Sequence, residues 1–238
     1  MNEQVDVVVV GRGPGGEYLA GTLAEAGLDV VGVEAELVGG ECPYWGCVPS
    51  KMMIRAGNAL AEARRVPALA GRAEVAPDWG PVAGRIRHEA TDDWNDRVAA
   101  DRLAAKGGRL VRGRGRLTGP HRVTVDGRVF EARRGVVLAT GSRPRIPPVP
   151  GLAATPYWTN RDAMAAKELP APMLVLGGGA IGAEVAQVVA VHLPGHHRGG
   201  TGPTAGPGGT GGGRTRRRGP AHRRSDRPDR GAGSPSRP

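Results

Sequence analysis

The sequence predicts an α/β protein, with a doubly wound, Rossmann-like domain over residues 1–150 and the start of a second nucleotide-binding domain over residues 151–189. Two observations lead to this prediction. A buried-strand pattern runs directly into a glycine-rich turn and a helix near the N-terminus, and the same order returns near residue 177. A third observation sets the C-terminal end of the second predicted domain, because hydrophobic periodicity ends after Val189. We expect residues 190–238 to form a disordered Gly/Pro/Arg-rich tail.

The first unit is a strand, a turn, a helix and a second strand. Val5 to Val10 is short, β-branched and almost wholly apolar, as a strand buried on both faces of a parallel sheet requires. The turn from Gly11 to Gly16 opens a helix that we expect to end near Gly27. Residues 28–33 form a second buried strand. The segment therefore predicts a βαβ unit with parallel strands.

Later elements follow from the same kind of pattern. Residues 47–65 and 81–106 predict helices, and residues 108–140 predict short strands joined by turns such as Asp126-Gly127. The proline-rich stretch 144–150 indicates a connection that leaves the first domain. Met173 to Leu176 predicts the opening strand of the second domain.

Charge and composition exclude several classes of protein. The formal charge of +10 is concentrated in residues 190–238, which hold ten Arg against two Asp, so the rest of the chain lacks the basic face of a nucleic-acid-binding domain. The longest apolar runs have the length of strands, which excludes a membrane span, and the acidic start is unlike a secretory signal. We therefore expect a cytoplasmic protein whose two cysteines serve redox or catalytic chemistry, or else are inert and buried.

The turn Gly11-x-Gly13-x-x-Gly16 has the surroundings of a dinucleotide-binding site. It follows a buried strand, opens a helix, and is followed by an acidic residue, Glu34, at the end of the next strand. Glycines let the backbone approach a pyrophosphate, the helix N-terminus supplies free N–H donors, and the carboxylate accepts hydrogen bonds from ribose hydroxyls. The alternative is a glycine turn with a purely structural role.

The two cysteines, Cys42 and Cys47, lie five residues apart in a segment that begins Gly39-Gly40-Glu41. Such a pair can close a small disulfide loop, and a cysteine at the start of a helix gains thiolate stabilisation from the helix dipole. This favours redox exchange. Inert buried thiols are one alternative. Metal binding is the other, but only two sulfurs are present and the histidines lie far away in sequence, so we expect no metal site.

The order of the motifs resembles the pyridine nucleotide–disulfide oxidoreductases, the flavoprotein family of dihydrolipoamide dehydrogenase, glutathione reductase and mercuric reductase. Residues 5–189 carry the resemblance. The first fingerprint is followed by the Cys-x4-Cys-Val-Pro-Ser-Lys segment, then by Ala139-Thr140-Gly141-Ser142-x-Pro144, and then by a second Gly-x-Gly-x-x-Gly that begins at Gly177. The resemblance implies an FAD-binding first domain and an oxidoreductase that uses FAD and NAD(P).

The resemblance also implies roles for single residues. Cys47 would face the flavin, Cys42 would exchange with a disulfide or dithiol substrate, and Lys51 paired with Glu184 would stabilise the reduced flavin. Electrons would pass between NAD(P)H, FAD and the Cys42–Cys47 disulfide. The implied FAD-binding residues are Gly11, Gly13, Gly16, Glu34, Thr140 and Gly141, and the implied nicotinamide-nucleotide residues are Gly177, Gly179 and Gly182.

Two departures limit what the resemblance transfers. Pro43-Tyr44-Trp45-Gly46 stands where better-known members carry small or apolar residues, so their substrates do not carry over. Arg12 inside the first fingerprint is tolerated if its side chain reaches solvent or contacts the pyrophosphate.

Competing functions are a catalytically inactive FAD-binding fragment and a reductase of a non-thiol acceptor such as a quinone or a metal ion. A monooxygenase is a third, against which the paired cysteines argue.

Residues 190–238 admit three interpretations: a basic arm for an acidic partner, a linker, or a shifted reading frame. Their Arg, Gly, Pro, Ala and His composition is what misread GC-rich codons yield, and the change falls inside a helix, where no domain boundary belongs. We therefore favour a frameshift or truncation. The resemblance implies a homodimer, but no dimerisation domain is recognisable in this chain.

Overall fold

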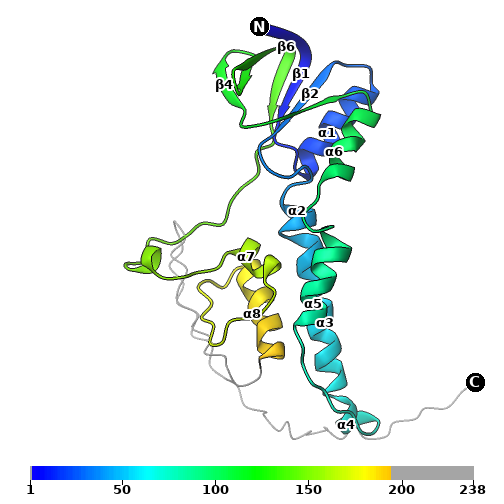
Figure 1. The fold of residues 1–238 in the computed structure, drawn as a ribbon, viewed down its shortest axis with the longest axis vertical. Coiled ribbons are helices and arrows are strands. Elements are labelled where there is room, and N and C mark those ends of the chain that lie inside the picture. Colours follow the sequence, from blue (N-terminus) through cyan, green and yellow to red (C-terminus); the bar gives the residue numbers. More distant parts are fainter. Residues whose placement is uncertain (1, 194–238) are drawn as a thin grey trace, which may run out of the picture. The chain divides into compact units, whose positions relative to one another are not determined.

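The computed structural model describes residues 2–193, and its central feature is a six-stranded sheet in the order β3-β2-β1-β6-β5-β4 (Figure 1). Strands β1, β2, β3 and β6 are parallel to one another, whereas β4 and β5 add an antiparallel edge to β6. This confirms the predicted α/β, Rossmann-like class. The strands are β1 (Asn2–Val10), β2 (Val30–Glu34), β3 (Arg109–Arg112), β4 (Arg116–Gly119), β5 (Arg122–Val125) and β6 (Arg128–Leu138).

The apolar run of β1 explains its central place, because a central parallel strand is covered on both faces. Val8 is paired with Val31 of β2 on one side and with Val136 of β6 on the other. Val7 and Val9 face the opposite way from Val8 and pack with residues of two helices, α1 (Pro14–Glu25) and α6 (Arg97–Ala105). Figure 1 shows these two helices beside the sheet.

The second face of the sheet is covered by the sheet's own antiparallel edge. Val8 and Val31 share a fully buried cluster with Val123 of β5 and Phe130 of β6. The connection between β5 and β6 is the predicted Asp126-Gly127 turn, in which both residues have positive φ. The sheet therefore has two hydrophobic layers, and its helix face carries the first glycine fingerprint.

The predicted helix over residues 81–106 is interrupted. It begins as α5 (Gly80–Arg85), widens into a single π-helical turn, η1 (Ile86–Ala90), and resumes only as α6. The buried Thr91 hydroxyl lies 3.1 Å from the carbonyl oxygens of both Ile86 and Arg87, and so competes for the bonds that would continue the helix. Periodicity did not reveal this competition.

The remaining helices include the two that carry the cysteines. Helices α2 (Glu41–Tyr44) and α3 (Cys47–Ala63) hold one cysteine each, and α4 (Val66–Leu69) follows them. A short turn, η2 (Leu152–Ala154), precedes α7 (Asn160–Ala165) and α8 (Ala180–His192). Helix α8 packs on α3, with Val188 lying beside Gly57.

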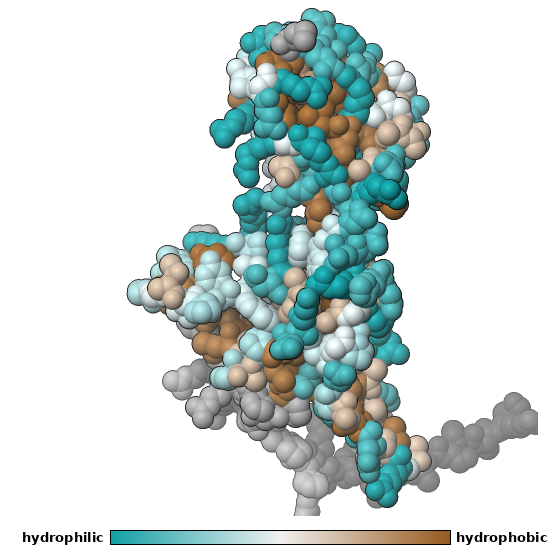
Figure 2. Space-filling model, viewed as in Figure 1, coloured by the Kyte–Doolittle hydropathy of each residue, from teal (hydrophilic) through white to brown (hydrophobic). Residues whose placement is uncertain are grey.

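The predicted strand at residues 173–176 is not formed. Met173 makes an isolated bridge, and residues 174–178 are irregular. A strand needs a neighbouring strand for its backbone hydrogen bonds, and here Leu174 and Leu176 are exposed by 63% and 54%. Figure 2 shows brown, hydrophobic residues on the surface of the part of the chain that carries α7 and α8.

Helix α8 continues to His192, beyond the point at which the sequence pattern ends. The predictions for the tail otherwise concern residues 194–238, which lie outside the described part of the chain. The predicted division near residue 150 stays a prediction. None of the helices within residues 2–193 combines the length and the apolarity needed to cross a lipid bilayer.

Candidate functional site

The first fingerprint forms a turn that only glycine allows. Gly11 has φ +94°, and a Cβ added to it would lie 2.3 Å from the carbonyl oxygen of Ala139. A Cβ on Gly16 would lie 2.0 Å from the carbonyl oxygen of Gly11. The absence of these two side chains lets β1, α1 and the end of β6 meet at one point.

Gly13 differs from these two glycines because it faces open space. A Cβ added to Gly13 meets no atom within 4 Å, and Gly13 caps α1 without any side-chain hydrogen bond to the free N–H groups of the first turn. It borders a cavity of about 630 Å³, which also reaches Glu34, Glu41, Thr140 and Gly141. The structure therefore brings the predicted FAD-binding residues together around one cavity, with the N-terminus of α1 at its wall.

The Glu34 carboxylate is held in place by two backbone groups. It accepts hydrogen bonds from the Arg12 N–H at 2.6 Å and from the Glu36 N–H at 2.8 Å. Both donors belong to the segments that border the cavity. The carboxylate is thereby fixed at the end of β2, where the sequence analysis placed a ribose-binding group.

The Arg12 side chain takes neither of the two expected courses. It is 1% exposed, it does not border the cavity, and its Nε and Nη1 have no hydrogen-bond partner among residues 2–193. Burial lowers the pKa of this guanidinium, while the charges of Glu17 and Glu34 oppose the shift. The side chain fits because β2 carries Gly32, where an added Cβ would lie 2.4 Å from Arg12 Nη1.

The cysteine segment consists of two short helical pieces joined at Gly46. Cys42 lies half-buried in α2, and Cys47 is exposed as the first residue of α3. Both thiols are free. A hydrogen bond with Cys47, together with burial, raises the pKa of Cys42. The two sulfurs are thus close enough to interact.

The cysteine segment is attached directly to the fingerprint turn. Gly39 and Gly40 have φ of +108° and +64°, so two successive glycines turn the chain sharply into α2. The Gly39 N–H donates to the Arg12 carbonyl at 2.7 Å, and a Cβ on Gly40 would lie 2.8 Å from the Gly13 Cα. The cavity therefore has the fingerprint on one side and the approach to the cysteines on the other.

Lys51 and Glu184 meet as the sequence analysis expects. Lys51 Nζ on α3 lies 2.9 Å from Glu184 Oε1 on α8, although the residues are 133 positions apart. The hydrogen bond from Lys51 holds the pKa of Glu184 below its ordinary value. The pair is partly exposed, so its contribution to stability is small.

The second fingerprint repeats the form of the first. Gly177 has φ +108°, a Cβ on Gly182 would lie 2.6 Å from the Gly177 carbonyl oxygen, and Gly179 caps α8. These three glycines lie outside the residues that border the 630 Å³ cavity. The structure thus gives two separate turns of one kind, only the first of which lies at that cavity.

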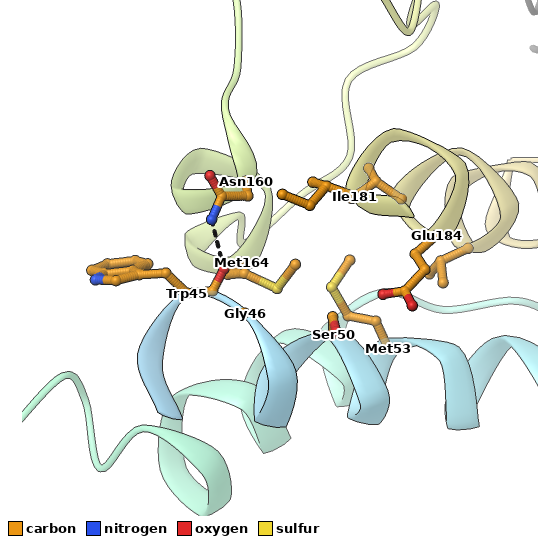
Figure 3. Close-up of a pocket in the computed structure, with 10 residues that line it drawn as sticks. Trp45, Gly46, Ser50, Met53, Asn160, Met164, Ile181 and Glu184 are labelled. Atoms are coloured by element: carbon orange, nitrogen blue, oxygen red, sulfur yellow. Dashed lines mark hydrogen bonds between the residues drawn. The ribbon is translucent and has the colours of Figure 1, made fainter. Parts of the chain in front are cut away.

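Several residues of the site were missed by sequence reasoning. Arg161 on α7 pairs with both Glu36 and Glu41 at the cavity. Asn160 donates to the Trp45 carbonyl oxygen at 2.7 Å, as Figure 3 shows beside a smaller pocket into which Met53 and Met164 point. These contacts join residues more than 100 positions apart, so local patterns carried no signal for them. Within residues 2–193, no three His, Cys, Asp or Glu side chains gather as a possible metal site.

Comparison with known protein families matches residues 5–196 to the pyridine nucleotide-disulphide oxidoreductases. The chain belongs to this family. Its members use FAD and NAD(P)H, and the family assignment agrees with the two fingerprints and the cysteine pair. The resemblance to this family that the sequence motifs indicate is therefore confirmed.

Individual relatives agree with this assignment. Dihydrolipoyl dehydrogenase of Halobacterium salinarum is 36% identical over 199 residues, covering 78% of this chain and 40% of the relative. Mercuric reductase of Acidithiobacillus ferrooxidans is 32% identical over 195 residues, covering 79% and 36%. The HOCl-induced flavoprotein disulfide reductase RclA of Escherichia coli superimposes with a TM-score of 0.66 at 26% identity, covering 79% and 40%. The chain thus spans about two fifths of the length of these relatives.

Proposed function

We propose that the protein is an FAD-dependent oxidoreductase that passes electrons between NAD(P)H and a disulfide or dithiol substrate through Cys42 and Cys47. The observation that carries the proposal is the cavity bordered by the fingerprint turn, because Gly40, Glu41 and Trp45 of the cysteine segment border it too, although neither cysteine does. Family membership supports the chemistry. The proposed cofactor site and the cysteine segment are then neighbours.

The cavity fits FAD on physical grounds. Gly13 presents no side chain to the open space, the free N–H groups of α1 suit a pyrophosphate, and the orientated Glu34 carboxylate suits ribose hydroxyls. Its volume of about 630 Å³ lies within the range of small-molecule sites. When bound, FAD supplies two-electron transfer between a nicotinamide and a pair of sulfurs.

The cysteines have distinct parts in the proposed reaction. When the Cys42 and Cys47 thiols form their S–S bond, they release two electrons and two protons, which the substrate disulfide takes up as its own S–S bond breaks. NAD(P)H supplies the electrons that reduce the pair again. The hydrogen bond with Cys47 and burial raise the pKa of Cys42, whereas Cys47 is exposed as the first residue of α3.

Lys51 and Glu184, which form an ion pair, are proposed to act as a positioning pair, with Lys51 supplying a positive charge to the bound cofactor as the family resemblance implies. Gly177, Gly179 and Gly182 are proposed to bind the nicotinamide nucleotide through the N-terminus of α8, by analogy with the first turn. For the whole protein we propose a homodimer in the cytoplasm, which follows from the family resemblance and the sequence, respectively.

The test combines thiol counting with the flavin spectrum. The chain is loaded with FAD and treated with oxidised or reduced dithiothreitol, and free thiols are then alkylated and counted by mass. We expect two thiols after reduction and none after oxidation. A long-wavelength charge-transfer band of the reduced protein should disappear in Cys47→Ser and persist in Cys42→Ser. Two thiols that survive oxidation, or a chain that retains no flavin, would refute the proposal.

The substrate is tested separately from the sulfur chemistry. NAD(P)H oxidation is followed with lipoamide, glutathione disulfide, a quinone or Cu(II) as the acceptor. Turnover with a disulfide that is lost in Cys42→Ser supports the proposed substrate class. Turnover with the quinone or the metal ion that is unchanged in both cysteine variants identifies a reductase of non-thiol acceptors instead.

A further inference from the structure

An aromatic stack stands beside the cysteine segment. The ring of Trp45, between the two cysteines, lies 5.2 Å from the ring of Trp94 at an interplanar angle of 23°. The Arg87 guanidinium covers the Trp94 ring at 5.1 Å, and the Arg161 guanidinium covers the Trp45 ring at 5.5 Å. We call these four side chains the Trp45–Trp94 stack. Offset aromatic pairs and cation–π contacts are both attractive in this geometry.

The backbone that presents Trp94 is unfavourable by itself. Trp94 follows the single π-helical turn η1, and Asp92, Asp93 and Trp94 have φ of 48°, 53° and 58°. Three consecutive left-handed non-glycine residues cost free energy, and such strain persists only where surrounding contacts impose it. The Trp94 indole N–H is also buried without an acceptor. The contact of Trp94 with Trp45 and the ion pair of Arg87 with Asp93 offset these costs.

Trp45 is held on its backbone as well as on its ring. Its N–H donates to the Glu41 carbonyl at 2.8 Å, and its carbonyl accepts from Asn160 at 2.7 Å. The neighbouring Tyr44 is buried against Gly39 on the other side of the segment. The residues between the cysteines are therefore anchored within their own segment by Tyr44, and from distant parts of the sequence by Asn160 and Trp94.

We propose that Trp94 is a positioning residue which, through the Trp45–Trp94 stack, holds Cys42 and Cys47 in the arrangement that closes their disulfide. The inference rests on the proposed function, because it concerns the same redox pair. The stack restricts the loop between the cysteines while both thiols are free, so less conformational entropy remains to be lost when the S–S bond forms. Trp94 thereby shifts the equilibrium toward the disulfide.

The equilibrium is measured against dithiothreitol. In the reaction, Cys42 and Cys47 lose two electrons and two protons to form their S–S bond, and oxidised dithiothreitol gains them to become the dithiol. The full-length chain is equilibrated in mixtures of the two forms, quenched with acid, alkylated and analysed by mass. This readout needs neither bound FAD nor turnover. The midpoint of the titration gives the equilibrium constant of the cysteine pair.

The variants separate the aromatic stack from a general loss of packing. Trp94→Leu should favour the dithiol about tenfold, which corresponds to a midpoint potential about 30 mV less negative. Trp94→Phe keeps an aromatic face, so the equilibrium constant of its cysteine pair should lie within about twofold of the wild-type value. Trp158→Leu is the matched control, since Trp158 is 41% exposed and stacks on no other ring of the described part of the chain. It should leave the midpoint unchanged.

A second pair of variants keeps the inference testable if Trp94→Leu fails to fold. Arg87→Gln removes the cation above Trp94 together with the ion pair to Asp93 that supports the same segment, and should shift the equilibrium about threefold toward the dithiol. Arg85→Gln, which breaks a pair with Glu89, should not shift it. A disulfide that forms with an unchanged midpoint in both Trp94→Leu and Arg87→Gln would overturn the inference. A wild-type chain that forms no disulfide would overturn the proposed function itself.

Discussion

Replacement of Arg12 by methionine is expected to stabilise the folded chain. The Arg12 side chain is 1% exposed beside Gly32 and Leu103, and two of its nitrogen atoms, Nε and Nη1, have no hydrogen-bond partner. A methionine of similar length fills the same space without buried donors. The change therefore removes a desolvation cost and leaves little cavity behind.

The magnitude follows from the two unpaired donors. Each buried, unsatisfied group costs ~1–3 kcal/mol, so the pair costs ~2–6 kcal/mol in the free energy of unfolding. The loss of attraction to Glu17 and Glu34 offsets part of this gain. We expect Arg12→Met to raise the free energy of unfolding by ~2 kcal/mol, within the range found when buried charges are replaced by apolar side chains.

Urea unfolding of the chain without added FAD, followed by far-ultraviolet circular dichroism, measures the effect as a change of midpoint at constant slope. Arg102→Met is the control, because Arg102 is 55% exposed and pairs with Glu17 at 2.8 Å. Its effect should stay below ~1 kcal/mol. If Arg12→Met were instead less stable than the wild type by ~1 kcal/mol or more, the guanidinium would have to be paired in the folded protein, and the reasoning would fail.

Four further outcomes are expected. Gly13→Val should fold but lose bound flavin, as read from the visible spectrum, because its side chain enters the cavity; Gly84→Val, also in open space, should retain flavin. Cys47→Ala should lower the pH at which iodoacetamide alkylates Cys42, because the hydrogen bond with Cys47 raises the pKa of Cys42; an unchanged pH midpoint contradicts this. Asp96→Asn should reduce the free energy of unfolding by ~1–3 kcal/mol at pH 7. Burial opposes ionisation of Asp96, but hydrogen bonds from Arg112 and Val38 outweigh burial and lower the pKa of the carboxyl group. The stabilisation by Asp96 is therefore present above the ordinary carboxyl pKa and is lost as the pH falls through the lowered pKa. Acid unfolding curves that run parallel for the wild type and Asp96→Asn would disprove this. Gly32→Ala should reduce the free energy of unfolding of the wild type by ~1–3 kcal/mol, because the added Cβ meets the Arg12 side chain. The same substitution should cost clearly less in the Arg12→Ala variant. Equal losses in the wild type and in Arg12→Ala would show that an alanine at position 32 does not compete with Arg12 for space.

Sequence patterns were sufficient wherever the structure depends on neighbours along the chain. The run Val5–Val10 predicted a strand buried on both faces of a parallel sheet, and the glycine spacing predicted the turn and helix that follow it. The family resemblance implied that the first fingerprint, Glu34 and residues 140–141 bind one cofactor. These residues border one cavity, because the ends of parallel strands meet at one edge of a sheet. Lys51 and Glu184 were paired only through the family resemblance, since no local pattern joins α3 to α8.

The features that sequence reasoning missed depend on contacts between distant segments. The interruption at residues 86–94 arises from the Thr91 hydroxyl and from the partner that Trp94 finds in Trp45. Arg12 was expected to reach solvent or the cavity because nothing in its neighbourhood reveals the space left by Gly32. The strand at residues 173–176 was predicted from its apolar residues, yet a strand requires a partner that periodicity does not supply.

The attachment of the cysteine segment to the fingerprint turn has a thermodynamic consequence. The Gly39 N–H bond to the Arg12 carbonyl and the close approach of Gly40 to Gly13 make the wall of the cavity and the approach to the sulfurs one continuous piece of backbone. Two equilibria that share a structural element obey reciprocity. If the cavity binds its ligand more tightly in the disulfide state than in the dithiol state by some factor, binding of the ligand shifts the equilibrium toward the disulfide by the same factor. The reverse preference shifts it toward the dithiol. Under the proposed function, a bound cofactor would therefore act on the sulfurs twice, as an electron carrier and as a ligand that biases their redox equilibrium.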